Sequence, residues 1–198
     1  IGSGFRIDSS GGPANLLNTM SSINIENAGE QDSEVILEIY QTAFPEEESA
    51  MVAKLAVDLL AEKTVPEILS LVAREIETPL GHVSFSPVKI ENNEPCKAFI
   101  LTPLAVHPEH QQKKVGSRLI EFGMKKLKEA GGNIVFVYGE PEFYGKFGFH
   151  ADTANDFPAP FDLEYPFGWQ ALILNDWSDK TTPAATSCVS ALSVPDLW

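Results

Sequence analysis

A strand, a turn, a helix and a second strand follow one another in the middle of the chain, and this segment limits the possible folds most. Residues 99–106 form one apolar run interrupted by Pro103, and residues 134–138 form a second run too apolar for an exposed strand. Between them, apolar residues recur at helical spacing from Val115, and Gly131-Gly132 is typical of a left-handed helix cap. Two continuously apolar strands joined by a helix predict a βαβ crossover with parallel strands.

The turn before this helix, residues 107–114, has the features of an anion site. A helix start collects unpaired backbone N–H groups and the positive end of the helix dipole. The dipole alone favours acids there, yet Lys113, Lys114 and Arg118 lie in or beside the turn. Cations at this end make sense if an anion is bound, so we expect a phosphate-bearing ligand. A solvated basic face is the alternative.

Two stretches in this region carry a resemblance. Residues 104–117 read LAVHPEHQQKKVGS, and residues 140–149 read EPEFYGKFGF. The first resembles motif A of the GNAT N-acetyltransferase superfamily, written Q/R-x-x-G-x-G/A, and the second resembles its motif B, Y-x-x-x-G-F. The likeness is greatest to the YhbS-like branch of predicted acetyltransferases. Gln111 and Gly116 fit motif A, whereas Lys114 stands where the family has its first glycine.

The resemblance implies a single α/β domain over residues 23–198. Its central sheet is mixed and mostly antiparallel, flanked by helices, and its fourth and fifth strands run parallel around the βαβ unit before they splay apart. Residues 1–22 are rich in Gly, Ser and Asn and lack periodicity. We therefore expect an N-terminal tail, either a cloning remnant or a segment ordered by contacts.

The resemblance also implies acetyl-CoA as the cosubstrate. Pantetheine would pair with the backbone of Leu104, Ala105 and Val106 where the strands splay. The pyrophosphate would lie on the backbone amides of the turn and helix start, namely Gln112, Lys113, Lys114, Val115, Gly116 and Ser117. Pro103 supports the splay independently, because proline cannot donate to a strand ladder. If position 114 requires a positive φ, lysine is strained there, or its charge compensates near the phosphates.

The expected chemistry is direct attack of an amine on the thioester. It requires a deprotonated amine, an oxyanion stabiliser and a proton for the leaving thiolate. By its place in motif B, Tyr144 would donate that proton; the alternative is an aromatic core residue among neighbouring phenylalanines. No acid occurs in residues 99–106, where some family members carry a glutamate. Glu140 is the candidate general base, and a turn acid without a chemical duty is an equal alternative.

Charge and composition limit the partners. The formal net charge of −14 argues against nucleic acid and is compatible with a cationic amine, from a small molecule or a protein. Two cysteines make no metal or redox spacing, so no metal is expected. No apolar run is long enough to cross a bilayer, so we expect a cytoplasmic protein without a membrane partner. The late strands offer an edge at which a homodimer could form.

Local patterns predict the remaining elements. Alternation predicts a strand at residues 23–26, Asp32 is suited to cap a first helix, and Pro45 is suited to begin a second. The glutamates at 46–48 are expected to complement the dipole of that second helix.

A hairpin is expected from residues 69–75 and 82–88 around a turn at 77–81, with His82 as a hydrogen-bonded structural residue. Strands are expected late in the chain at residues 170–174 and 188–194.

These observations together predict an enzyme, an acetyl-CoA-dependent N-acyltransferase that transfers an acetyl group to an amine. The alternative is a non-catalytic acyl-CoA-binding or sensing module with the same fold, which the missing strand acid and Lys114 keep open. A nucleotide-binding βαβ domain of another kind is disfavoured, because the chain lacks a G-x-G-x-x-G run and a P-loop lysine motif.

Overall fold

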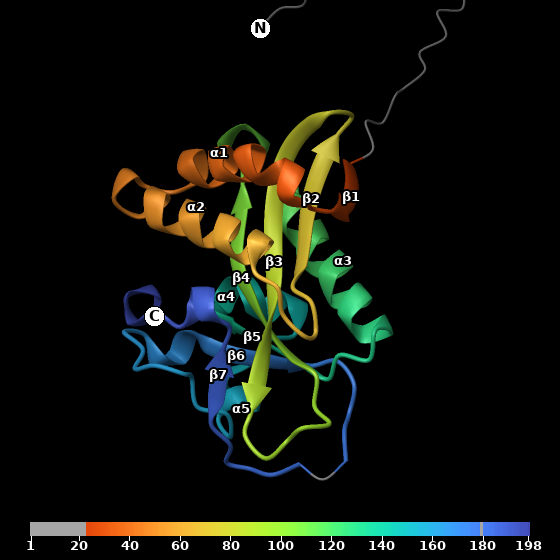
Figure 1. Ribbon diagram of the computed structural model, residues 1–198, viewed down its shortest axis with the longest axis vertical. Helices are drawn as coiled ribbons and strands as arrows, with labels where there is room; N and C mark the ends of the chain where they lie inside the picture. The colour runs from red at the N-terminus through yellow and green to blue at the C-terminus, as the bar shows by residue number, and fades with distance from the viewer. Residues whose placement is uncertain (1–22, 179) are drawn as a thin grey trace, which may run out of the picture.

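One twisted sheet runs through the molecule and carries helices on both faces (Figure 1). The computed structural model describes residues 23–178 and 180–198, so the expected tail at residues 1–22 lies outside the described residues. The strand order is β1-β2-β3-β4-β5-β6, with β7 paired to β3. The strands are β1 Ile23–Asn27, β2 Leu69–Glu75, β3 Thr78–Ile90, β4 Ala98–Val106, β5 Ile134–Tyr138, β6 Trp169–Ile173 and β7 Thr186–Cys188.

The strand pairing matches the mixed, mostly antiparallel sheet expected from the sequence. Among the described strands, β4 and β5 form the one parallel pair, and every other neighbouring pair is antiparallel. The connection between β4 and β5 passes through a long helix, as the βαβ prediction requires. No helix in the described ranges is long and apolar enough to cross a membrane.

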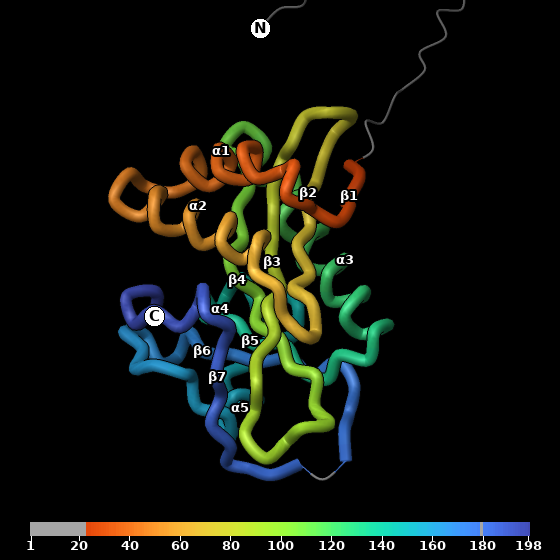
Figure 2. Tube along the Cα trace, in the orientation of Figure 1, coloured from red at the N-terminus to blue at the C-terminus, as the bar shows by residue number. Residues whose placement is uncertain are grey.

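The helices cover the two faces of the sheet separately, as the backbone trace in Figure 2 also shows. Helices α1 and α2 pack on one face, and α3 packs on the other. The helices are α1 Ser33–Ala43, α2 Glu46–Ala61, α3 Val115–Glu129, and the one-turn helices α4 Pro141–Tyr144 and α5 Ala151–Ala154.

Helix α3 lies close against β3 because of a single glycine. A Cβ atom built on Gly123 would lie 2.1 Å from Cε2 of Phe85, so any side chain there would push the helix off the sheet. The predicted cap at the other end of the helix is confirmed. Gly131 has a φ of +80°, and the N–H of Gly132 donates to the carbonyl of Leu127 at 2.7 Å.

The hairpin prediction placed the turn too late. Strand β3 begins at Thr78, so the turn falls at Ile76 and Glu77, and Pro79 and Gly81 belong to the strand. Gly81 is needed there for close approach: a Cβ on it would lie 2.8 Å from the carbonyl oxygen of Ala105 on β4. Residues that usually signal a turn therefore serve strand packing in this hairpin.

The predicted last strand at residues 188–194 is wrong. Pairing of β7 with β3 ends at Cys188, and a 3₁₀ helix follows at Ser190–Leu192. The carboxylate of Glu62, just after α2, accepts hydrogen bonds from the backbone N–H groups of Ser190 and Ala191 at 2.9 and 3.0 Å. These bonds hold the chain in a turn and take up the donors that a strand would have used.

Asp32 also departs from its predicted role. It precedes α1, but its side chain makes no capping bond to that helix. Its carboxylate instead accepts from the N–H of Gly29 at 2.8 Å and pairs with Arg74 on β2. Asp32 therefore ties the start of α1 to the sheet.

His82 has the structural role expected from its sequence. The residue is fully buried on β3, with Nδ1 2.9 Å from the hydroxyl of Tyr40 and Nε2 2.7 Å from the hydroxyl of Ser70. One ring nitrogen donates and the other accepts, so the ring is neutral. Burial lowers the pKa of His82 to about 3. The three residues join α1 to strands β2 and β3.

This network predicts a loss of stability in mild acid. An unfolded histidine takes up a proton near pH 6.5, whereas folded His82 remains neutral down to about pH 3. The contribution of neutral His82 to the free energy of unfolding is therefore fully present above pH 6.5. It falls as the pH drops from there toward 3, by about 1.4 kcal/mol per pH unit at most. Urea unfolding at pH 7.5 and pH 5 should show a smaller loss in His82→Gln than in the wild type. Equal losses would contradict the assignment.

Candidate functional site

Strands β4 and β5 pair only over their first three residues and then separate. The parallel pairs run from Ala98 with Ile134 to Ile100 with Phe136, and none follows. Strand β4 continues beside β3 as far as Val106. The register between β3 and β4 shifts where β4 carries one extra residue, in the segment that contains Pro103. The position of Pro103 thus agrees with the predicted break, and one edge of β4 is left without a strand partner in β5.

A cavity of about 370 Å³ opens at this end of β4 and is called here the turn cavity. It brings together eight of the nine residues proposed from the sequence for cofactor binding; the exception is Lys113. The lining residues are Leu104, Ala105, Val106, His110, Gln111, Gln112, Lys114, Val115, Gly116, Ser117 and Phe143.

The turn itself has an alternating backbone. Gln112 and Lys114 have φ angles of 63° and 61°, both in the left-handed region. Lys114 is the N-cap of α3, so it has the conformation for which the family motif supplies glycine. Alternation of left- and right-handed residues can turn successive N–H groups toward one concave side, which suits an anion. Position 114 therefore has the positive φ at which lysine is strained.

Gly116 lies at the second position of α3 for a different reason. A Cβ on it would lie 3.5 Å from Cγ2 of Val106 and 3.9 Å from Cδ2 of Leu104, which is ordinary van der Waals contact. The backbone therefore does not require glycine there. The missing side chain leaves open the space between the end of β4 and the start of α3, which is the turn cavity.

The basic residues near the turn are arranged differently from the expectation. Of Lys113, Lys114 and Arg118, only Lys114 lines the cavity. Arg118 donates to the carbonyl of Ile23 on β1 at 3.0 Å, and the Lys113 ammonium lies 3.5 Å from Nδ1 of His110. We expected all three charges at the anion site because a sequence does not show in which direction long side chains point.

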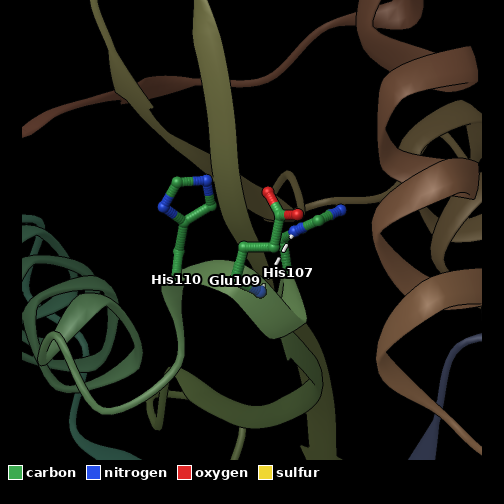
Figure 3. A group of neighbouring side chains, drawn as sticks. All are labelled: His107, Glu109 and His110. Carbon is green, nitrogen blue, oxygen red and sulfur yellow. Dashed lines mark hydrogen bonds between the residues drawn. The ribbon is translucent and has the colours of Figure 1, made fainter.

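Three potential metal ligands occur on the segment after β4 (Figure 3). One ligand atom each from His107, Glu109 and His110 lies within 4.8 Å of the others. Nδ1 of His107 already accepts a weak bond from the N–H of Glu109 at 3.4 Å, and the Lys113 ammonium stands beside His110. A positive neighbour opposes a bound cation, and the set lies beside the turn cavity, which would hold an anion.

Helix α4 separates the turn cavity from a second cavity. Phe143 lines the turn cavity, and Pro141 lines the other. The Tyr144 ring lines neither cavity and packs against Gly139, which lines the second one: a Cβ on Gly139 would be 2.5 Å from Cε2 of Tyr144. Burial raises the pKa of Tyr144 to about 12, so its hydroxyl keeps its proton at neutral pH. The ring also packs edge-on against Phe143 and Phe149, as the core alternative expected.

The second cavity, called here the acidic cavity, has a volume of about 560 Å³. Its walls come from the start of α2, the end of β5 and two late segments. Its polar walls include four carboxylates, those of Glu48, Glu140, Glu164 and Asp196, and its apolar walls include the rings of Tyr138, Tyr165, Phe167 and Trp198. Glu140 is the N-cap residue of α4, three residues before the phenylalanine that lines the turn cavity.

Sequence reasoning missed most of the acidic cavity. It named Glu140, but it assigned Glu48 only to the dipole of α2, whose first turn does contain it. The late aromatic and acidic residues lie in irregular segments, where no periodicity marks a shared face. A dense run of aromatics between residues 157 and 169 was the available signal.

Comparison with known proteins agrees with this architecture. Residues 24–151 match the family described as Acetyltransferase (GNAT) domain. The chain is 37% identical over 114 residues to the uncharacterized N-acetyltransferase YjhQ of Escherichia coli K12, and the match covers 56% of this chain and 62% of that protein.

Two solved structures share the fold. One is YhbS of Escherichia coli in complex with CoA, with a TM-score of 0.73, 24% identity, and coverage of 87% of this chain and 92% of that one. The other is a GNAT family acetyltransferase of Brucella melitensis in complex with acetyl-CoA, with a TM-score of 0.66, 24% identity, and coverage of 87% and 99%. The family match spans more than half of the 198 residues, and the chain therefore belongs to the GNAT acetyltransferase family.

Proposed function

We propose that this protein is an acetyl-CoA-dependent N-acetyltransferase that joins an acetyl group to an amine by direct attack. The observation that carries the proposal is that the short helix α4, which ends at Tyr144, contributes one residue to each of two cavities, Pro141 to one and Phe143 to the other. The turn cavity has the backbone of an anion site, and the acidic cavity has the charge of an amine site. The turn cavity is lined by the end of β4 and the acidic cavity by the end of β5, in each case beyond the last residue that pairs β4 with β5.

The residues around the turn cavity fit the chemistry of acetyl-CoA. The start of α3 offers backbone N–H groups, and Lys114 adds a positive charge for the pyrophosphate. Beyond Ile100, the edge of β4 facing β5 has no strand partner. The amide groups of pantetheine would pair with Leu104, Ala105 and Val106 on that edge, as another strand would.

The catalytic step needs two proton transfers by this chain. Glu140 would accept a proton from the attacking amine at the mouth of the acidic cavity. The new C–N bond forms as the C–S bond breaks, and the electron pair leaves with sulfur. Tyr144 would give its proton to that sulfur and recover one from solvent. Tyr144 is protonated at neutral pH, and its raised pKa makes it a weak acid whose hydroxyl donates to the sulfur only as negative charge develops there.

The YhbS and Brucella melitensis structures, which contain CoA and acetyl-CoA, support the choice of cosubstrate. A non-catalytic acyl-CoA-binding module would keep the turn cavity and the packing of Tyr144 but would need no acidic cavity. Steady-state release of free thiol with a panel of amines distinguishes the two functions.

The first prediction tests the turn cavity through Gly116. Acetyl-CoA at about 100 times its Kd should stabilise the wild type by about 2.7 kcal/mol and raise its melting temperature. Gly116→Asp should abolish this shift, because its side chain fills the cavity and its charge repels the pyrophosphate. The control is Gly116→Ala, whose Cβ makes only ordinary contacts and should leave the fold intact. An unchanged shift in Gly116→Asp would refute the assignment.

The second prediction separates strain from charge at Lys114. Lysine in the left-handed conformation destabilises the folded state by about 1–2 kcal/mol. Glycine removes this strain, but it lowers the free energy of unfolding by about 0.5–1 kcal/mol because its unfolded chain has more conformational freedom. Lys114→Gly should therefore raise the free energy of unfolding by about 0.5–1 kcal/mol, whereas Lys114→Ala should not. Both variants should weaken CoA binding about two- to fivefold at low salt, because the charge is lost. Tighter binding by Lys114→Gly would mean that strain dominates.

The third prediction concerns Tyr144. Tyr144→Phe keeps the ring that packs against Phe143 and Phe149, so the fold and the CoA affinity should not change. The kcat should fall by roughly ten- to a thousandfold, because the departing thiolate loses its proton donor. Thiol release and calorimetry with CoA measure the two quantities. A wild-type kcat would leave Tyr144 as a core residue only.

A further inference from the structure

The lining of the acidic cavity indicates which amine it accepts. We propose, on the basis of the function proposed above, that the acceptor is a small aliphatic primary amine that carries at least one further ammonium group. The attacking amine would lie beside Glu140, and the second cation would lie among the carboxylates of Glu48, Glu164 and Asp196.

The charge of the cavity exceeds what one amine needs. A nucleophilic amine must lose its proton, so a single carboxylate at the reacting end is sufficient. Three more carboxylates, those of Glu48, Glu164 and Asp196, line the same cavity, and no Lys, Arg or His side chain lines it. None of the four forms an ion pair within the described residues. All four residues are exposed, so each carboxylate attracts a cation only modestly, and a ligand with several ammonium groups can gain from more than one of them.

The aromatic walls give the cavity a second feature that acidic clusters lack. Tyr138 and Trp198 are stacked, with ring centroids 6.4 Å apart and planes 18° from parallel. The Tyr138 hydroxyl accepts from the N–H of Tyr165 at 3.0 Å and fixes the late loop to β5. Flat apolar faces suit methylene chains and attract ammonium groups through cation–π contacts. Alternating methylenes and ammonium groups are the chemistry of an aliphatic polyamine.

The size of the cavity favours a small molecule over a peptide. Its volume of about 560 Å³ lies in the range of about 300–1,000 Å³ that is usual for small-ligand sites. The loop that contains Phe167 and the 3₁₀ helix Pro195–Leu197 supply two of its walls. A free polyamine can enter such a site whole, whereas a lysine side chain would bring its peptide backbone to the rim.

The test compares acceptors that differ in their number of ammonium groups, with butylamine and 1,4-diaminobutane as a pair of equal chain length. Thiol release is measured with butylamine, 1,4-diaminobutane, spermidine and a lysine-containing peptide. The kcat/KM should be about tenfold or more higher for spermidine than for butylamine, since two added charges meet the wall carboxylates. Glu164→Gln and Asp196→Asn should each raise the KM for spermidine about fivefold and leave that for butylamine within twofold. Glu142→Gln is the control, because Glu142 is an exposed acid on α4 outside the cavity.

The outcomes separate this inference from the proposed function. Equal turnover of butylamine and spermidine, or a preference for the peptide, would overturn the inference and leave the acetyltransferase intact. Absence of turnover with every amine would count against the function. Calorimetry of spermidine with the CoA-bound protein then tests whether spermidine binds in the acidic cavity. Binding that weakens in Glu164→Gln but not in Glu142→Gln supports the polyamine site, and no binding refutes it.

Discussion

The candidate site depends on the point at which β4 and β5 stop pairing. Three parallel residue pairs join the strands, and then β4 stays with β3 while β5 turns into α4. An unpaired strand edge inside a protein is costly unless something pairs with it. The proposed pantetheine would form hydrogen bonds with the unpaired backbone groups of β4. The break in pairing that weakens the sheet would therefore also determine where this ligand lies. The unpaired end of β4 lines the turn cavity, and the end of β5 lines the acidic cavity.

The two faces of the sheet carry different parts of the proposed site. Helix α3 on one face brings the backbone amides of its first turn to the end of β4. On the other face, α2 brings Glu48 beside the end of β5, and the hydrogen bonds of His82 with Tyr40 and Ser70 hold α1 to β2 and β3. The proposed cosubstrate and acceptor would thus be held by elements from opposite faces of the sheet.

The βαβ unit and the turn were predictable because periodicity and glycines determine them locally. Continuous apolar runs marked β4 and β5, and the left-handed Lys114 stood where the motif has glycine. The direction of Arg118 was not predictable, because its partner, the carbonyl of Ile23, is 95 positions away. Nor was the end of β7, which depends on the distant carboxylate of Glu62. Long-range hydrogen bonds, rather than weak propensities, account for these misses.

The bonds from Glu62 to Ser190 and Ala191 join a helix of the shared family region to a segment beyond it. The match to the family ends at residue 151, and Glu164, Phe167 and Trp198 of the acidic cavity lie past that boundary. Together with the pairing of β5 with β6 and the bond from Tyr165 to Tyr138, the carboxylate of Glu62 thus holds this later segment against the region that matches the family. A protein that carried a different segment here would keep the lining of the turn cavity and lose these walls of the acidic cavity.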